Sequence, residues 1–283
     1  MLKSVLVLLD ETPSSASARK FALRLAQNTG AALAGLAGID LTFIEAPMLG
    51  GIGTSSIKVR LEEKLKKQAD GARQRLHEVF EIECRAHNLP FEWFSFEGDP
   101  MEVLDLATET RDLVITGHDT AFHGNVHEPL SEILANLLLK TPRPVIICAD
   151  SLSIPENLLI AYDGSVPARR AVQMFALLGI GQGKRIQVIS IDASQELATR
   201  RTAAAATYLR SHGYVVDANP ISSRDHPEKV LNIEIADQKI GMLVIGAYGR
   251  RGFREFLFGS TMSALIEKPP RNLCLSLVVM KYC

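Results

Sequence analysis

The chain has 283 residues, which suits two domains of ordinary size or one large one, and its 47% hydrophobic residues argue against intrinsic disorder. Lys+Arg count 31 and Asp+Glu 32, so the charge balance gives no reason to expect nucleic acid or an anionic membrane as a partner. The apolar start is cut off at Asp10, too early for a signal segment, and no run reaches the roughly 18 apolar residues of a membrane span. We therefore expect a cytoplasmic protein. The cysteines are scattered and fit reduced thiols: Cys84, Cys148, Cys274 and Cys283.

Strand and helix patterns alternate over the first 150 residues. A buried strand ends at Asp10, the helix after it stops at Gly30, and Pro100 lies in the first turn of a later helix. The expected strands cover residues 5–10, 31–39, 91–96, 113–115 and 145–148. The expected helices cover residues 14–28 and 57–79, and two more begin near Pro100 and Ser131.

The second half of the chain repeats this plan. Its first strand ends at Asp163 as the first strand of the chain ends at Asp10, and the helix that follows stops at Gly179. The expected strands cover residues 158–163, 186–191, 214–218, 242–245 and 275–279. The expected helices cover residues 165–178, 198–212 and 262–268, with another beginning at Pro227.

Strands that alternate with helices predict parallel sheets covered by helices on both faces. We therefore predict an α/β protein built from two tandem, doubly wound, parallel five-stranded sheets. The predicted domains are residues 1–150 and 151–283, joined by the short polar, proline-bearing stretch 150–155. In such sheets ligands bind beyond the carboxyl ends of the strands, where Asp163 and Gly246 are both expected.

The segment after the strand at 242–245 has the features of a phosphate site. Gly246 and Gly249 would let backbone N–H groups approach a ligand. Gly259 and Ser260 stand where a helix begins, with free N–H donors and the positive end of the helix dipole. Ser260 would cap that helix with or without phosphate. Three arginines between the glycines add positive charge, as phosphate contacts or as a solvated face: Arg250, Arg251 and Arg254.

The spacing of these glycines resembles the nucleotide loop of universal stress proteins. In nucleotide-binding members this loop holds the phosphates and ribose of ATP, while an Asp after the first strand and the backbone ending the second strand take the adenosine. The matching positions are Asp163, which could alternatively be a simple turn former, and Ile191. The nucleotide-binding residues that the resemblance implies are Asp163, Gly164, Ser165, Ile191, Gly246, Gly249, Arg250, Arg251, Gly252, Gly259, Ser260 and Thr261.

The resemblance also implies a fold and an assembly. The fold would be adenine nucleotide alpha hydrolase-like and Rossmann-like in both halves. In this family the last strands pair across a two-fold axis, so here residues 145–148 and 275–279 would pair within one molecule and relate the halves by a pseudo-two-fold. That pairing would cover two sheet edges and make an intramolecular pseudo-dimer. Further association into a homodimer stays open.

The first half departs from the family pattern in the loop. Asp119 falls roughly where Gly249 falls in the second half, and the next helix starts near Ser131 without a Gly–Ser pair. An acidic side chain repels phosphate, and a residue other than glycine limits backbone approach. We therefore expect that the first half has lost triphosphate binding, although Asp10 is kept.

Two further segments have alternative interpretations. Residues 49–54 are glycine-rich but lack the Gly-Lys-Ser/Thr ending of a P-loop, so we favour a lid or plain connector. Histidine and acidic residues gather in the first-half loop, but their spacing matches no compact zinc motif, and we favour a solvated loop and predict no metal site. These residues are His118, Asp119, His123, His127 and Glu128.

Three functions follow, in order of preference. The first is a stress-response regulator that binds ATP or another adenine nucleotide, with Mg or another divalent cation, in the second half and shifts a partner or assembly equilibrium. The second is a slow ATP hydrolase, which would need a transition-state charge such as Arg251 or Arg254. The third is an interaction module whose first half binds a small ligand or a protein. We predict no catalytic residues, because the sequence has no G-x-S-x-G elbow, no H-E-x-x-H and no Walker lysine.

Overall fold

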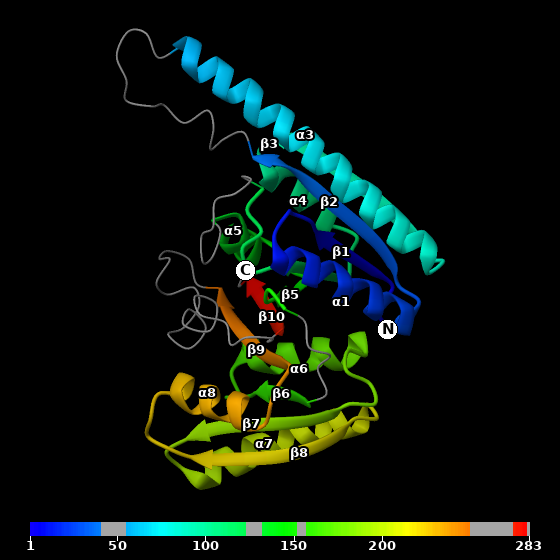
Figure 1. Cartoon of the computed structure of the whole chain (residues 1–283). Helices are drawn as coiled ribbons and strands as arrows, with labels where there is room; N and C mark the ends of the chain where they lie inside the picture. The colour runs from blue at the N-terminus through cyan, green and yellow to red at the C-terminus, as the bar shows by residue number, and fades with distance from the viewer. Residues whose placement is uncertain (41–54, 123–131, 152–156, 250–273, 282–283) are drawn as a thin grey trace.

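The computed structural model describes residues 1–40, 55–122, 132–151, 157–249 and 274–281 (Figure 1). Strands and helices alternate in the described part of each half, as predicted, except that the stretch between the last two strands of the second half lies outside the described residues. The elements of the first half are β1 (Ser4–Leu8), α1 (Pro13–Thr29), β2 (Ala32–Asp40), α3 (Ser55–Ala86), β3 (Phe91–Gly98), α4 (Pro100–Thr108), β4 (Leu113–Gly117), α5 (Glu132–Lys140) and β5 (Pro144–Cys148). Those of the second half are β6 (Asn157–Ala161), α6 (Val166–Leu178), β7 (Arg185–Asp192), α7 (Gln195–Ser211), β8 (Val215–Ser222), α8 (Pro227–Asp237), β9 (Met242–Gly249) and β10 (Cys274–Lys281). The expected helix at 262–268 lies outside the described residues.

Local sequence signals set the ends of the two helices that matter most for the site. The side chain of Thr12 accepts a hydrogen bond from Ser15 N–H (3.2 Å) at the start of α1, and Ser165 accepts one from Ala168 N–H (3.3 Å) at the start of α6. Both helices end in a left-handed glycine, as predicted, with φ of 71° at Gly30 and 74° at Gly179. The same signals therefore place α1 and α6 alike in the two halves.

The ten described strands form one sheet, in the order β3-β2-β1-β4-β5-β10-β9-β6-β7-β8. The strands are parallel within each half, and β5 pairs with β10 in the antiparallel direction. The expected pairing of the last strands is therefore confirmed, and Figure 1 shows β5 and β10 meeting in the middle of the molecule. The predicted join at 150–155 falls between β5 and β6, and residues 152–155 of it lie outside the described residues.

The antiparallel pairing relates the two halves by an approximate two-fold axis. Ile146 of β5 pairs with Ser276 of β10. This pair is flanked by the Val145–Leu277 pair on one side and the Ile147–Leu275 pair on the other. Because the two strands run in opposite directions, the carboxyl ends of the two parallel halves lie at opposite edges of the sheet.

Helices cover both faces of the sheet, with a hydrophobic core on each. Alternate strand residues point to opposite faces, so Val5 and Val7 of β1 lie in one core and Leu6 and Leu8 in the other. Helices α1, α3, α6 and α7 contribute to the first core, and α4, α5 and α8 to the second. Figure 1 shows α3 as a long helix running along β2 and β3. Among the described residues, no helix is both long and apolar enough to span a membrane.

Candidate functional site

The strand order reverses between β1 and β4 in the first half and between β6 and β9 in the second. The crevice outside the carboxyl ends of strands at such a reversal is where doubly wound sheets bind ligands. Asp10 follows β1 and Asp163 follows β6, so each half places an aspartate at its reversal point. These two ends of the sheet are the candidate sites.

Strand register makes the two ends comparable residue by residue. When the register of β1 with β4 is continued, Gly117 falls opposite the residue before Asp10. When the register of β6 with β9 is continued, Gly246 falls opposite the residue before Asp163. The two glycines are therefore equivalent. Counting on from these glycines, the residue that takes the place of Gly249 is Thr120. The expectation that Asp119 falls at that position is therefore wrong by one residue, because the alignment by sequence matched the apolar strand runs rather than their partners in the sheet.

Both glycines lie against the first turn of a helix. A Cβ on Gly117 would lie 2.7 Å from the backbone nitrogen of Ser15 in α1, and a Cβ on Gly246 would lie 2.5 Å from that of Ala168 in α6. The space beside Gly246 is thus taken by the helix, whereas the sequence suggested that it makes room for a ligand. The close approach brings the N-terminus of each helix to the strand end, where it offers N–H groups and a positive dipole.

The first-half site is closed around Asp10. Its Oδ2 accepts hydrogen bonds from the N–H groups of Ala121 (3.2 Å) and Phe122 (3.1 Å), and its Oδ1 accepts one from Glu11 N–H (2.8 Å). Burial raises the pKa of the Asp10 carboxyl above its ordinary value, and the three N–H donors oppose that shift. The carboxylate that could meet a ligand is therefore held by the chain itself.

Phe122 fills the same end of the sheet. Its side chain is 2% exposed, and its ring stands edge-on to that of Phe96 on β3, with the ring centroids 5.0 Å apart. Its carbonyl accepts a hydrogen bond from the N–H of Asp40 at the end of β2 (3.0 Å). The backbone of Phe122 has a φ of 57°, the left-handed region that costs a residue other than glycine free energy. Sequence reasoning missed Phe122 because no local motif marks it.

The second-half site is exposed at the equivalent aspartate. Asp163 is exposed to solvent, and its Oδ1 accepts a hydrogen bond from Ser165 N–H (2.8 Å). Gly164 has a φ of 78°, and its carbonyl accepts a hydrogen bond from Arg169 Nε (2.8 Å). The structure thus brings the predicted residues Asp163, Gly164 and Ser165 together at the start of α6, beside Gly246.

Charged and apolar groups surround this second-half end. Asp192, which ends β7, forms an ion pair with Arg201 of α7 (2.7 Å), and the Arg201 side chain also passes Gly164. The N–H of Ser194 and the guanidinium of Arg201 hold the pKa of Asp192 below its ordinary value. Four partly buried apolar side chains lie nearby: Ala161, Ile191 and Ile221 at the carboxyl ends of β6, β7 and β8, and Ile245 within β9. The sequence singled out Ile191, while Arg201 had no motif to reveal it.

Of the remaining predicted site residues, Gly249 is described and is the last residue of β9. The predicted phosphate-loop residues from 250 to 261 lie outside the described residues, as do residues 49–54. Their roles stay predictions.

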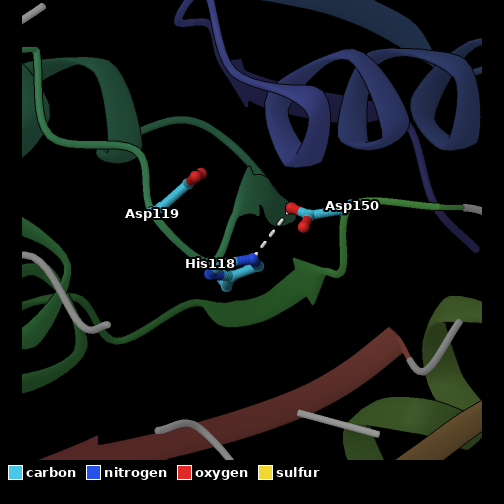
Figure 2. Close-up of side chains that lie close together, drawn as sticks. All are labelled: His118, Asp119 and Asp150. Carbon is cyan, nitrogen blue, oxygen red and sulfur yellow. Dashed lines mark hydrogen bonds and ion pairs between the residues drawn. The ribbon is translucent and has the colours of Figure 1, made fainter. Parts of the chain in front are cut away.

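Three potential metal ligands lie together in the first half: His118, Asp119 and Asp150 (Figure 2). Their ligand atoms lie within 4.8 Å of one another, whereas ligands of a tetrahedral zinc ion lie about 3.4 Å apart. His118 Nε2 lies 3.0 Å from Asp150 Oδ1, and Asp119 accepts a hydrogen bond from the Ser14 hydroxyl. These contacts account for the three side chains, and we assign no metal to them. His123, His127 and Glu128 lie outside the described residues.

Comparison with known proteins gives a consistent picture. Residues 155–273 match the model of Usp, the universal stress protein family. Universal stress protein Slr1230 of Synechocystis sp. is 21% identical over 161 residues, a match that covers 56% of this chain and 55% of that protein. This chain therefore spans about half the length of that relative.

Solved structures share the whole fold. A universal stress protein from Archaeoglobus fulgidus aligns with a TM-score of 0.68 at 16% identity, over 97% of each chain. The functionally unknown protein PA1789 from Pseudomonas aeruginosa aligns with a TM-score of 0.54 at 15% identity, over 98% of this chain and 92% of that one. At these identities the likeness concerns the fold alone.

Proposed function

We propose that the chain is a member of the universal stress protein family, whose model matches residues 155–273, and that it is a regulatory protein that binds an adenine nucleotide, ATP with a divalent cation, in its second half. The observation that carries the proposal is the exposed Asp163 at the strand-order reversal, beside the N-terminus of α6. In nucleotide-binding members of the family an aspartate at this position takes the adenosine.

The surroundings of Asp163 fit the two ends of a nucleoside. The partly buried side chains of Ile191, Ile221 and Ile245 offer an apolar wall for a base. The exposed carboxylate of Asp163 can accept hydrogen bonds from ribose hydroxyls. Ile191 is the last residue but one of β7. The family resemblance expects the backbone at the end of this strand to contact the base.

The phosphates would lie beyond β9. The family match includes the loop that follows Gly249, and its Gly259 and Ser260 would offer N–H donors to the phosphates. Arg250 and Arg251 would add positive charge there. Binding would order this loop and so shift an equilibrium with a protein partner or a second copy of the chain, which makes the nucleotide a signal rather than a substrate. A cytoplasmic location is part of the same proposal.

The first test is to identify what the purified protein carries. The protein is purified without added nucleotide and denatured, and the released small molecules are identified by chromatography and mass spectrometry. The proposal expects near-stoichiometric ATP or ADP, or, if none is retained, a heat of binding on titration with Mg-ATP. The variant Gly259→Asp places a carboxylate among the phosphates and should lose both signals. A wild-type protein that carries no nucleotide and gives no heat of binding with Mg-ATP would overturn the proposal.

The same preparation separates binding from turnover. Release of phosphate that vanishes in Asp163→Ala and Gly259→Asp would assign slow hydrolysis to this site. Phosphate release that persists in both variants comes from a contaminating enzyme. A regulatory protein should show tight binding with no turnover that depends on these two residues.

A further inference from the structure

Residues 120–122 contact the carboxyl ends of β1, β2 and β3 in the way that a bound small molecule would. Two N–H groups, those of Ala121 and Phe122, reach one oxygen of the Asp10 carboxylate. The carbonyl of Phe122 accepts the N–H of Asp40, and its ring stands against Phe96. A pair of donors, an acceptor and an aromatic ring therefore converge on one end of the sheet from a single short segment.

We propose that residues 120–122 are a built-in ligand of the first half, and that this end of the sheet takes a free nucleoside only when the segment has left it. This inference rests on the contacts of the first half alone. It does not depend on whether the second half binds a nucleotide.

The segment is held as a ligand is held, by contacts along its whole length. Asp119 is anchored to α1 through the hydroxyl of Ser14, and both are buried. Phe122 is 2% exposed. Its left-handed backbone lets one residue present its N–H to Asp10 and its carbonyl to Asp40. Because that conformation costs free energy, the surrounding contacts must overdetermine it.

The groups that the segment engages define the chemistry of a ligand that could replace it. The Asp10 carboxylate accepts hydrogen bonds, as it would from the two adjacent hydroxyls of a ribose. The N–H of Asp40 requires an acceptor, which the ring nitrogens of a base provide, and Phe96 offers an aromatic face or edge. By strand register Asp119 takes the position of residue 248, next to the predicted phosphate loop of the second half, and it stays anchored to Ser14, so its buried carboxylate would repel phosphates. The replacing ligand is therefore a nucleoside rather than a nucleotide.

At the carboxyl end of the second-half strands, the described residues include no segment equivalent to 120–122. Asp163 is exposed, whereas burial raises the pKa of Asp10. Ile221 takes the position of Phe96 by strand register and is only partly buried. The two ends share a backbone frame, and among the described residues a segment that fills it is seen in the first half.

The test removes the ring and keeps the backbone. Phe122→Gly deletes the side chain, and glycine adopts the left-handed conformation freely. The matched control Phe122→Leu keeps apolar volume at the same position. Nuclear magnetic resonance of the full chain then follows the amide of Asp40 and the ring of Phe96, which report the first half only, during titration with adenosine. Signals of Ile191 and Asp163 report any separate binding in the second half.

The proposal expects a graded result. In the wild-type protein and in Phe122→Leu, adenosine leaves the Asp40 amide and the Phe96 ring unchanged. In Phe122→Gly the Asp40 amide should exchange with solvent at least about tenfold faster, and adenosine should slow it again. Adding Asp10→Ala to Phe122→Gly should remove the response to adenosine. A folded Phe122→Gly protein whose Asp40 amide ignores adenosine overturns the proposal, as does a wild-type protein whose first half binds it.

A second variant keeps the proposal testable if Phe122→Gly does not fold. Asp10→Ala removes the acceptor that both N–H groups of the segment use. The amides of Ala121 and Phe122 should then exchange at least about tenfold faster than in the wild-type protein, while strand amides of the second half keep their protection. Unchanged protection of Ala121 and Phe122 would show that Asp10 does not hold the segment and would overturn the proposal.

Discussion

The two halves share their strand order, their helix starts and the glycine that each packs against its first helix, yet their carboxyl ends differ. In the first half the strand-end carboxylate of Asp10 is satisfied by the chain's own amides, and Phe122 fills the space beside it. In the second half the equivalent Asp163 is exposed. Two ends built from equivalent elements can therefore differ in whether nearby residues of the chain cover the strand-end carboxylate.

The electrostatics of the two ends differ in the same sense. Burial raises the pKa of Asp10, whereas N–H and guanidinium donors lower that of Asp192. A buried carboxylate such as that of Asp10 needs several hydrogen-bond donors to stay charged. A carboxylate partly exposed to solvent, such as that of Asp192, is stabilised by water and by the neighbouring arginine. The comparison suggests four ways to test or sharpen it.

The largest expected effect comes from emptying the filled end. Phe122→Ala removes a ring that is 2% exposed and should lower the free energy of unfolding by about 3–5 kcal/mol. Phe122→Gly should be less harmful than Phe122→Ala by about 1 kcal/mol, because glycine carries no cost at a φ of 57°. Urea denaturation midpoints of the three proteins give this order. If alanine proves the milder change, the left-handed backbone does not persist in solution.

The two equivalent glycines should respond alike even though their ends differ. Gly117→Ala and Gly246→Ala would each press a Cβ into the first turn of a helix and should cost about 1–3 kcal/mol of unfolding free energy. Gly71→Ala is the matched control, because the atom nearest to its new Cβ is the flexible end of Arg75, at 3.2 Å. On a helix that change should stabilise by about 0.5–1 kcal/mol. Thermal unfolding of the three variants checks both signs.

Nucleotide binding should depend on the exposed aspartate. Asp163→Ala should weaken the binding of Mg-ATP by about tenfold or more through the loss of hydrogen bonds to the ribose. Asp217→Ala, an exposed carboxylate on β8, is the control and should leave binding unchanged. Isothermal titration calorimetry measures both. Equal affinity in Asp163→Ala and the wild-type protein would remove Asp163 from the site.

The smallest effect is a difference in pH dependence. The pKa of Asp192 is lowered in the folded protein, so its stabilisation is present above the ordinary value of 3.8 and is lost as the pH falls through the folded value. Asp192→Asn should therefore be less stable than the wild-type protein at pH 7, and the gap should close in acid. Asp10, whose pKa is raised, contributes the opposite slope above 3.8. Denaturation curves from pH 7 to pH 3 show whether the gap closes.

The sequence carried most of the fold because its signals are local. Apolar runs, proline in first helical turns, and glycine stops at Gly30 and Gly179 each act within a few residues, and all agree with the structure. The pairing of β5 with β10 followed from the family resemblance. Phe122 could not be predicted in this way, because its partners Asp10, Asp40 and Phe96 are far from it in the chain. The shift from Asp119 to Thr120 likewise became visible only from the strand register.

The antiparallel junction of β5 with β10 has a consequence for communication between the halves. It sends the two carboxyl ends to opposite edges of the sheet, so one ligand cannot bridge Asp10 and Asp163. Along the backbone of the sheet, a change at one end reaches the other only through the short ladder centred on Ile146 and Ser276. Side-chain packing is a second route, because each hydrophobic core contains residues of both halves.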